Sequence, residues 1–158
     1  MRALLNIFVL DPSPKLAAVY QCDKHVVKMV LESAQLLCSQ FDPKYNPPYK
    51  RTHYNHPCSV WARISKQNFL WLAAHAMYLS IEYTFRYGRI HAANKAIRWA
   101  IDNVDLINLP STTLTDFALA MPDKYKENSA VNSYRNYYKG DKVVFAKWNR
   151  GRQSPAWW

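Results

Sequence analysis

The chain has 158 residues, the length of one domain (residues 1–158), and its 49% hydrophobic and 20% charged residues exclude a disordered or collagen-like protein. Its 21 lysines and arginines exceed its 11 aspartates and glutamates, so the formal net charge is +10 and a polyanionic partner is favoured. No apolar run approaches the roughly 18 residues that a membrane-spanning helix needs. The three cysteines, an odd and small number, favour a reducing, cytoplasmic compartment.

Apolar periodicity and capping residues predict a mainly α protein. Residues 3–10 are a short apolar run that predicts one buried strand. Ser13 is a suitable N-cap for the helix that follows, and Gly88 is a suitable end for the second long helix. The expected elements are a strand at residues 3–10, a loop at residues 41–57, and helices at residues 14–39, 58–87, 90–103, 115–121 and 129–140. We therefore expect a compact, single-domain helical fold with at most a short N-terminal strand element.

The C-terminal third depends on weaker signals. Thr115 or Asp116 is expected to cap a short helix, and Ser129 a longer one that Gly140 should end. Residues 141–158 form a basic, aromatic tail, which we expect to pack on the domain or to flank it. Its tryptophans are expected to close the hydrophobic core rather than to stack on bases.

The first long helix carries a narrow polar strip on an otherwise apolar surface. At 100° per residue, the strip contains Lys24, His25, Lys28 and Glu32 within one arc. Asp23 falls inside the apolar arc, where an unpaired carboxylate is costly. Either Asp23 caps a break in the helix at Cys22 and Asp23, or it is a site carboxylate.

Carboxylates next to lysines are suited to acid/base and Schiff-base chemistry. The polar strip therefore supplies one set of catalytic candidates: Asp23, Lys24, His25, Lys28 and Glu32. The ordinary alternative for the lysines is a solvated helix face with a Lys28–Glu32 ion pair.

Two segments combine basic and aromatic residues in the way nucleic-acid-binding proteins do. Between positions 43 and 66 there are five basic residues and no acidic one, and from position 135 to the end there are six basic residues and one acidic one. Cations neutralise phosphates, and rings stack on bases. The ordinary alternative for the first segment is a surface loop in which His56 only starts a helix. The nucleic-acid-binding candidates are Lys50, Arg51, His53, Tyr54, His56, Arg63, Arg135, Lys139, Lys142, Arg150 and Arg152.

A zinc site is a further alternative. Cys22 and His25 are three residues apart, as are His53 and His56, and spacings of this kind occur in structural zinc sites. No CxxC pair accompanies them, so our expectation is that the protein binds no metal.

Several motifs follow one another in a familiar order along most of the chain. The sequence resembles the endonuclease V-type pyrimidine-dimer DNA glycosylases and related small phage proteins. The matching segments are NIFVLDP at 6–12, DKHVVK at 23–28 with LESAQLL at 31–37, YNHP at 54–57 followed by Trp61, EY at 82–83 with RYG at 86–88, and residues 134–142. The resemblance implies a compact helical fold in which an N-terminal amine attacks the sugar C1′, a Schiff base forms and a helical carboxylate assists. Base loss and β-elimination then follow without a metal or other cofactor.

The sequence departs from this pattern at two points. Five residues precede the matched Asn6, and Met1 is expected to be retained before Arg2, so Lys24 or Lys28 becomes an alternative Schiff-base amine. The helical carboxylate is Asp23 rather than a glutamate, and Glu32 is its alternative.

These observations predict a DNA N-glycosylase, with or without abasic-site lyase activity, that acts on damaged or modified pyrimidines. The expected partner is DNA, most simply a duplex, and no membrane. A non-enzymatic accessory protein that binds DNA or RNA, and a zinc-binding protein, are the alternatives.

Overall fold

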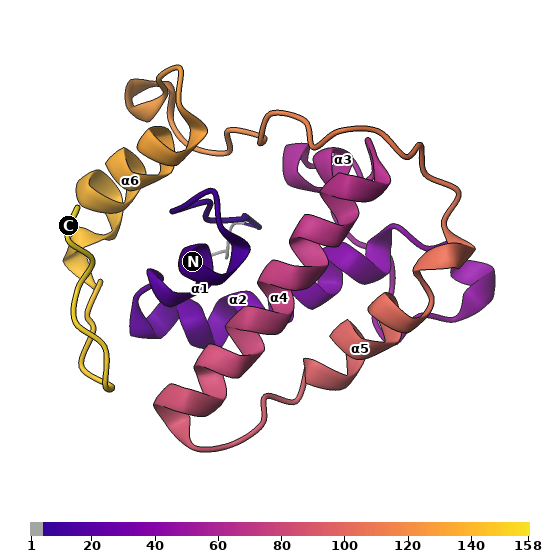
Figure 1. Cartoon of the computed structure of the whole chain (residues 1–158), viewed down its shortest axis with the longest axis horizontal. Helices are drawn as coiled ribbons and strands as arrows, with labels where there is room; N and C mark the ends of the chain where they lie inside the picture. Colours follow the sequence, from indigo (N-terminus) through magenta and orange to yellow (C-terminus); the bar gives the residue numbers. More distant parts are fainter. Residues whose placement is uncertain (1–4) are drawn as a thin grey trace.

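The computed structural model describes residues 5–158, and within them the protein is helical and contains no β-strand (Figure 1). The α-helices are α1 (Pro14–Val19), α2 (Asp23–Ser39), α3 (Pro57–Ala62), α4 (Lys66–Tyr87), α5 (Asn94–Asp102) and α6 (Ala130–Asp141). Short 3₁₀ helices are η1 (Pro43–Tyr45), η2 (Val104–Leu106), η3 (Asp123–Tyr125) and η4 (Lys142–Val144). The predicted mainly α class is confirmed. No helix of the described chain is long and apolar enough to cross a membrane.

The centre of the fold is helix α4, which packs against α1, α2 and α5 (Figure 1). Its buried face includes Phe69, Leu72 and Leu79, which join one continuous hydrophobic core. Helix α6 and the C-terminal tail lie on the other side of the N-terminal segment from α4 (Figure 1). A long connection, residues 107–122, crosses from η2 to that side.

The prediction of a strand at residues 3–10 is wrong for residues 5–10, and residues 3 and 4 lie outside the described chain. The segment is buried, with Leu10 fully enclosed, but helices and loops surround it and no strand lies beside it. Side chains satisfy part of its backbone instead: the Asn6 side-chain oxygen Oδ1 accepts from Ile7 N–H at 2.8 Å, and Arg135 Nε donates to Leu10 O at 2.9 Å.

The first predicted helix is broken between α1 and α2. This agrees with the alternative in which the helix breaks at Cys22 and Asp23. Cys22 is extended and precedes α2, so Asp23 begins the new helix. Its side chain does not cap that helix. Instead the buried Arg86 donates to Val19 O (2.8 Å), to Gln21 O (2.7 Å) and to the Asp23 carboxylate (3.1 Å), and thereby stabilises the break.

The second predicted helix is also divided, because Ser65 is extended and caps α4 by accepting from Asn68 N–H at 3.1 Å. Helix α4 ends at Gly88, whose φ of 73° is left-handed, as predicted. The predicted helix at residues 115–121 is not formed. The buried Asn68 side chain binds both the backbone N–H and the hydroxyl of Thr115, at 3.0 and 2.6 Å, so Thr115 cannot cap a helix.

The last helix begins as predicted but ends one residue later than expected. Ser129 caps α6 by accepting from Asn132 N–H, whereas Gly140 lies inside the helix. A Cβ atom at Gly140 would collide with the Tyr125 ring, so this glycine permits a close contact rather than a helix end.

The tail tryptophans pack against the domain, as expected. Trp148, Trp157 and Trp158 surround the buried Tyr138 ring, at centroid distances of 6.4, 6.1 and 6.4 Å. The Trp148 indole also donates to Tyr20 O at 3.1 Å, at the end of α1. The tail therefore closes one side of the core.

Candidate active site

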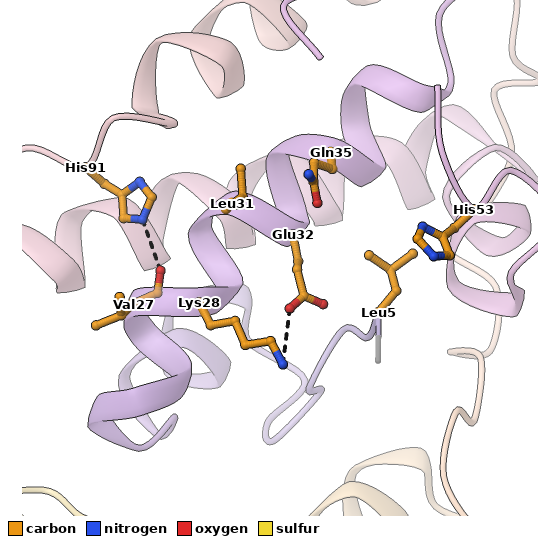
Figure 2. A pocket seen from close by; sticks show the side chains of 8 residues that line it. All are labelled: Leu5, Val27, Lys28, Leu31, Glu32, Gln35, His53 and His91. Carbon is orange, nitrogen blue, oxygen red and sulfur yellow. Dashed lines mark hydrogen bonds and ion pairs between the residues drawn. The ribbon is translucent and has the colours of Figure 1, made fainter. Parts of the chain in front are cut away.

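A cavity of about 430 Å³ opens beside α2 (Figure 2). Helix α2 supplies most of its wall, because residues spaced by three, four and seven positions share one face of a helix. Leu5, the first described residue, the loop before α3 and the segment before α5 supply the rest. The lining residues are Leu5, Val27, Lys28, Leu31, Glu32, Gln35, His53 and His91.

The carboxylate of Glu32 is the unusual group of this cavity. The residue is only 7% exposed, and within residues 5–158 neither carboxylate oxygen has a well-formed hydrogen bond. Burial raises the pKa of Glu32, and the effects of Lys28, the Asn6 backbone N–H and Lys142 oppose that rise. A buried carboxylate without hydrogen bonds costs folding free energy, so packing of α2 holds it in place.

Lys28 is the cation that forms an ion pair with Glu32. Its Nζ lies 3.5 Å from Glu32 Oε2, one helical turn away, and its side chain is 38% exposed (Figure 2). A half-exposed amine on a flexible stem can reach into the cavity while it remains next to the carboxylate. The structure thus brings two of the predicted catalytic residues together at the pocket.

His25 lies behind this pair rather than in the cavity. Its ring stacks on Phe8 at 4.4 Å, and its Nδ1 hydrogen-bonds the Tyr138 hydroxyl at 2.6 Å. Burial, reinforced by three nearby lysines, lowers the pKa of His25 to about 3, so the ring is neutral at physiological pH. The lysines are Lys142, Lys28 and Lys24.

Asp23 and Lys24 do not line the cavity. The Asp23 carboxylate is shared between Arg86 at 3.1 Å and the backbone N–H of Asn149 at 2.8 Å, which ties the tail to the start of α2. Lys24 is exposed, with its Nζ 4.7 Å from the centre of the Phe145 ring. The N-terminal amine, the nucleophile that the resemblance implies, lies outside the described residues.

Two polar lining residues, His91 and Gln35, were not among the predicted site residues. His91 is structural, because its Nδ1 accepts from Ala93 N–H and its Nε2 therefore donates to Val27 O, both at 3.0 Å. Gln35 is half-buried and follows Glu32 by three positions, a spacing that places both on one helix face. That spacing was the signal that could have identified Gln35.

Most cations of the predicted binding loop face the protein. Arg51 donates to Ser39 O and Phe41 O at the end of α2, at 3.0 and 2.9 Å. Arg63 donates to Tyr54 O at 2.7 Å, and the Tyr54 ring lies between the two guanidinium groups, 4.1 and 3.7 Å away. His56 caps α3 through Cys58 N–H. These residues shape the loop, whereas Lys50 is exposed.

The cations of α6 and the tail divide in the same way. Arg135 binds Leu10 O, and Arg152 holds both carboxylate oxygens of Glu82 at 2.9 Å. Lys139 and Arg150 are exposed, the latter over the Tyr87 ring at 4.5 Å. Lys142 lies 3.2 Å from the Tyr137 hydroxyl and close enough to act on Glu32.

The zinc alternative is wrong for this structure. Among the described residues, no group of three or more His, Cys, Asp or Glu side chains is placed to hold a metal ion. Cys22 and His25 both contact the Tyr138 hydroxyl, whereas His53 binds Thr52 and His56 caps α3. The four proposed ligands therefore serve separate local contacts.

Searches against protein-family models, curated proteins and solved structures find no match to this chain. A function must therefore be inferred from the cavity and from four of its polar lining residues, Lys28, Glu32, Gln35 and His53.

Proposed function

We propose that the protein is a DNA N-glycosylase with abasic-site lyase activity that acts on a damaged or modified pyrimidine nucleotide. One observation carries the proposal: the buried carboxylate of Glu32, which has no well-formed hydrogen bond among the described residues, lies 3.5 Å from the Lys28 amine at an open cavity. An amine and an adjacent proton acceptor are the two groups that Schiff-base catalysis requires.

The first step is the activation of the amine. The Lys28 ammonium transfers a proton to Glu32, and burial assists because it favours the protonated carboxyl group. The free Lys28 nitrogen attacks C1′ of the sugar. The C1′–N bond to the base breaks, and its electron pair leaves with the base, which takes up a proton.

The second step cleaves the strand. The attacking nitrogen loses its extra proton as the sugar ring opens, O4′ becomes a hydroxyl, and a C1′=N iminium forms. Glu32, once it is ionised again, removes a proton from C2′, and the C3′–O bond breaks with its electron pair leaving on the phosphate. Water then hydrolyses the iminium and restores the Lys28 amine.

The charge and size of the site support a nucleotide of DNA as the substrate. Lys28 and Lys142 both lie near Glu32 and His25, and a polyanion would bind favourably beside these cations. The cavity of about 430 Å³ lies within the range of sites for small ligands, so one nucleotide has to leave the duplex stack to enter it.

Borohydride trapping on a duplex with one abasic site tests the proposal. Wild-type protein should form a covalent adduct, Lys28→Ala should lose it, and Lys24→Ala should keep it, because Lys24 is an exposed lysine of the same helix that does not line the cavity. Glu32→Gln should slow adduct formation by roughly 10²–10⁴-fold.

Peptide mapping of the adduct identifies the amine. An adduct on the Lys28 peptide supports the proposal, and one on the N-terminal peptide that persists in Lys28→Ala overturns the assigned nucleophile. Salt-sensitive binding of the duplex without any adduct would favour a non-enzymatic accessory protein.

A further inference from the structure

The fourth of these polar lining residues is His53. We propose that His53 is a catalytic residue that donates a proton from Nε2 to the departing base. This inference rests on the proposed glycosylase function and assigns the group that protonates the leaving base.

The backbone around His53 is fixed to the end of α2. The Ser39 hydroxyl accepts from Thr52 N–H at 3.0 Å and donates to Thr52 O at 3.1 Å. Arg51 adds its two bonds to the carbonyls there. These anchors hold the His53 backbone at a φ of 49°, a left-handed conformation that residues other than glycine adopt at a cost in free energy.

The ring of His53 is oriented by one neighbour and leaves one nitrogen free. Its Nδ1 lies 2.8 Å from the Thr52 hydroxyl, and among the described residues no group hydrogen-bonds Nε2. The hydroxyl can accept from Nδ1–H in both the cationic and the neutral ring. The ring therefore keeps its orientation when Nε2 loses its proton, as a general acid must.

The position of His53 matches the direction of the reaction. Lys28 and His53 line the same cavity, on opposite sides of Glu32 and Leu5 (Figure 2). In a displacement at C1′, the base departs on the side away from the attacking nitrogen. With Lys28 as the nucleophile, the departing base faces the His53 wall.

Other lining residues are less suited to this proton transfer. Both ring nitrogens of His91 are already hydrogen-bonded, and Glu32 lies on the Lys28 side, where it takes up the ammonium proton. The Gln35 amide is too weak an acid to protonate the departing base. His53 is exposed, so after transferring its proton it regains one from water.

The proton balance is simple. The base leaves with the electron pair of the C1′–N bond, accepts the Nε2 proton, and departs neutral, while the imidazolium becomes a neutral imidazole. Among the described residues, the charged or titratable groups around the cavity and the His53 loop include Glu32 and Lys28 from α2, His91 from the segment before α5, and Arg51 and His56 from the loop itself.

The experiment compares two substrates, one with a base and one without. Duplexes containing uracil or thymine glycol report base release, and a duplex with a preformed abasic site reports the lyase step alone. His53→Asn is the variant, because asparagine tolerates the left-handed conformation. It should slow base release by roughly 10²–10⁴-fold and leave trapping at the abasic site within threefold of wild type.

Variants of Thr52 separate chemistry from structure. Thr52→Val, which removes only the orienting hydroxyl, should reduce base release by about tenfold, and Thr52→Ser should restore it.

Failure of this inference is distinct from failure of the proposed function. If wild-type protein forms no adduct at the abasic site, the glycosylase–lyase proposal itself fails. If it forms the adduct but releases none of the bases, or if His53→Asn slows both substrates equally or neither, the role of His53 is overturned and the lyase assignment stands.

Discussion

Replacing Glu32 by glutamine should make the protein more stable at neutral pH while it impairs the chemistry. The wild-type carboxylate is buried without a well-formed hydrogen bond among the described residues, and its nearest cation, Lys28, is partly solvated. A neutral amide of the same shape removes the cost of a buried charge, and Lys28 can turn into water.

The expected gain is about 1–2 kcal/mol. An unsatisfied buried polar group costs about 1–3 kcal/mol, and the amide, which also lacks partners, retains part of that cost. The pKa of Glu32 is raised above its ordinary value of 4.5, so the native state binds the proton more tightly than the unfolded chain does. The penalty is therefore absent below pH 4.5 and develops as the pH rises through the native pKa.

Urea unfolding followed by tryptophan fluorescence at pH 5 and pH 7.5 measures this difference. Glu82 provides a matched control, because it is equally buried but fully hydrogen-bonded. Burial alone would raise the pKa of Glu82, but the hydrogen bonds from Arg152 and Arg86 outweigh it and lower the pKa. Glu82→Gln should lose about 3 kcal/mol at pH 7.5 and less at lower pH, the opposite sign and trend.

The stability of Glu32→Gln decides between two roles for this carboxylate. A loss of more than about 1 kcal/mol at pH 7.5 would mean that Glu32 is a structural anchor like Glu82. The reasoning that makes it a reactive group would then be refuted.

Two further predictions concern ionisable groups outside the cavity. Asp23→Asn should lower the free energy of unfolding by about 2 kcal/mol, because Arg86 loses a charged partner, and should leave borohydride trapping intact; loss of trapping in the folded variant would make Asp23 the catalytic carboxylate. Burial lowers the pKa of His25 to about 3 and that of His75 to about 4, so their neutral forms contribute stability that is complete above pH 6.5 and is lost as the pH falls. Urea titrations from pH 7 to pH 4 should show a decline of several kcal/mol, which His75→Gln should reduce; a flat profile would contradict the buried, neutral histidines.

Capping residues in the sequence correctly predicted helix ends at which a single residue determines the local structure. Ser13 and Ser129 cap helices as expected, and Gly88 ends α4. The helix break before Asp23 was one of two open alternatives, because the residue that stabilises it, Arg86, lies 63 positions away. No local pattern contains such a partner.

The candidate site was predictable only in part, because some of its walls come from segments that are distant in the sequence. Helical periodicity placed Lys28 and Glu32 on one strip, but the same strip also fits a solvated face. What distinguishes the two is the N-terminal segment near Leu5 and the His53 loop, which bury the carboxylate from outside the helix. The predicted basic loop was misleading where Arg51 and Arg63 turn inward to satisfy backbone carbonyls.

Glu32 and Glu82 together explain why we propose the cavity, and not the ion-pair network, as the reactive part of the molecule. Both glutamates are buried on helices that pack against each other, yet their pKa values are displaced in opposite directions. Two arginines satisfy Glu82, so its proton affinity is low and its bonds hold α4 to the tail. Glu32 has a lysine on one side and an open cavity on the other. A buried carboxylate whose pKa is raised, and which has no well-formed hydrogen bond among the described residues, is the one that we propose exchanges a proton with a bound nucleotide.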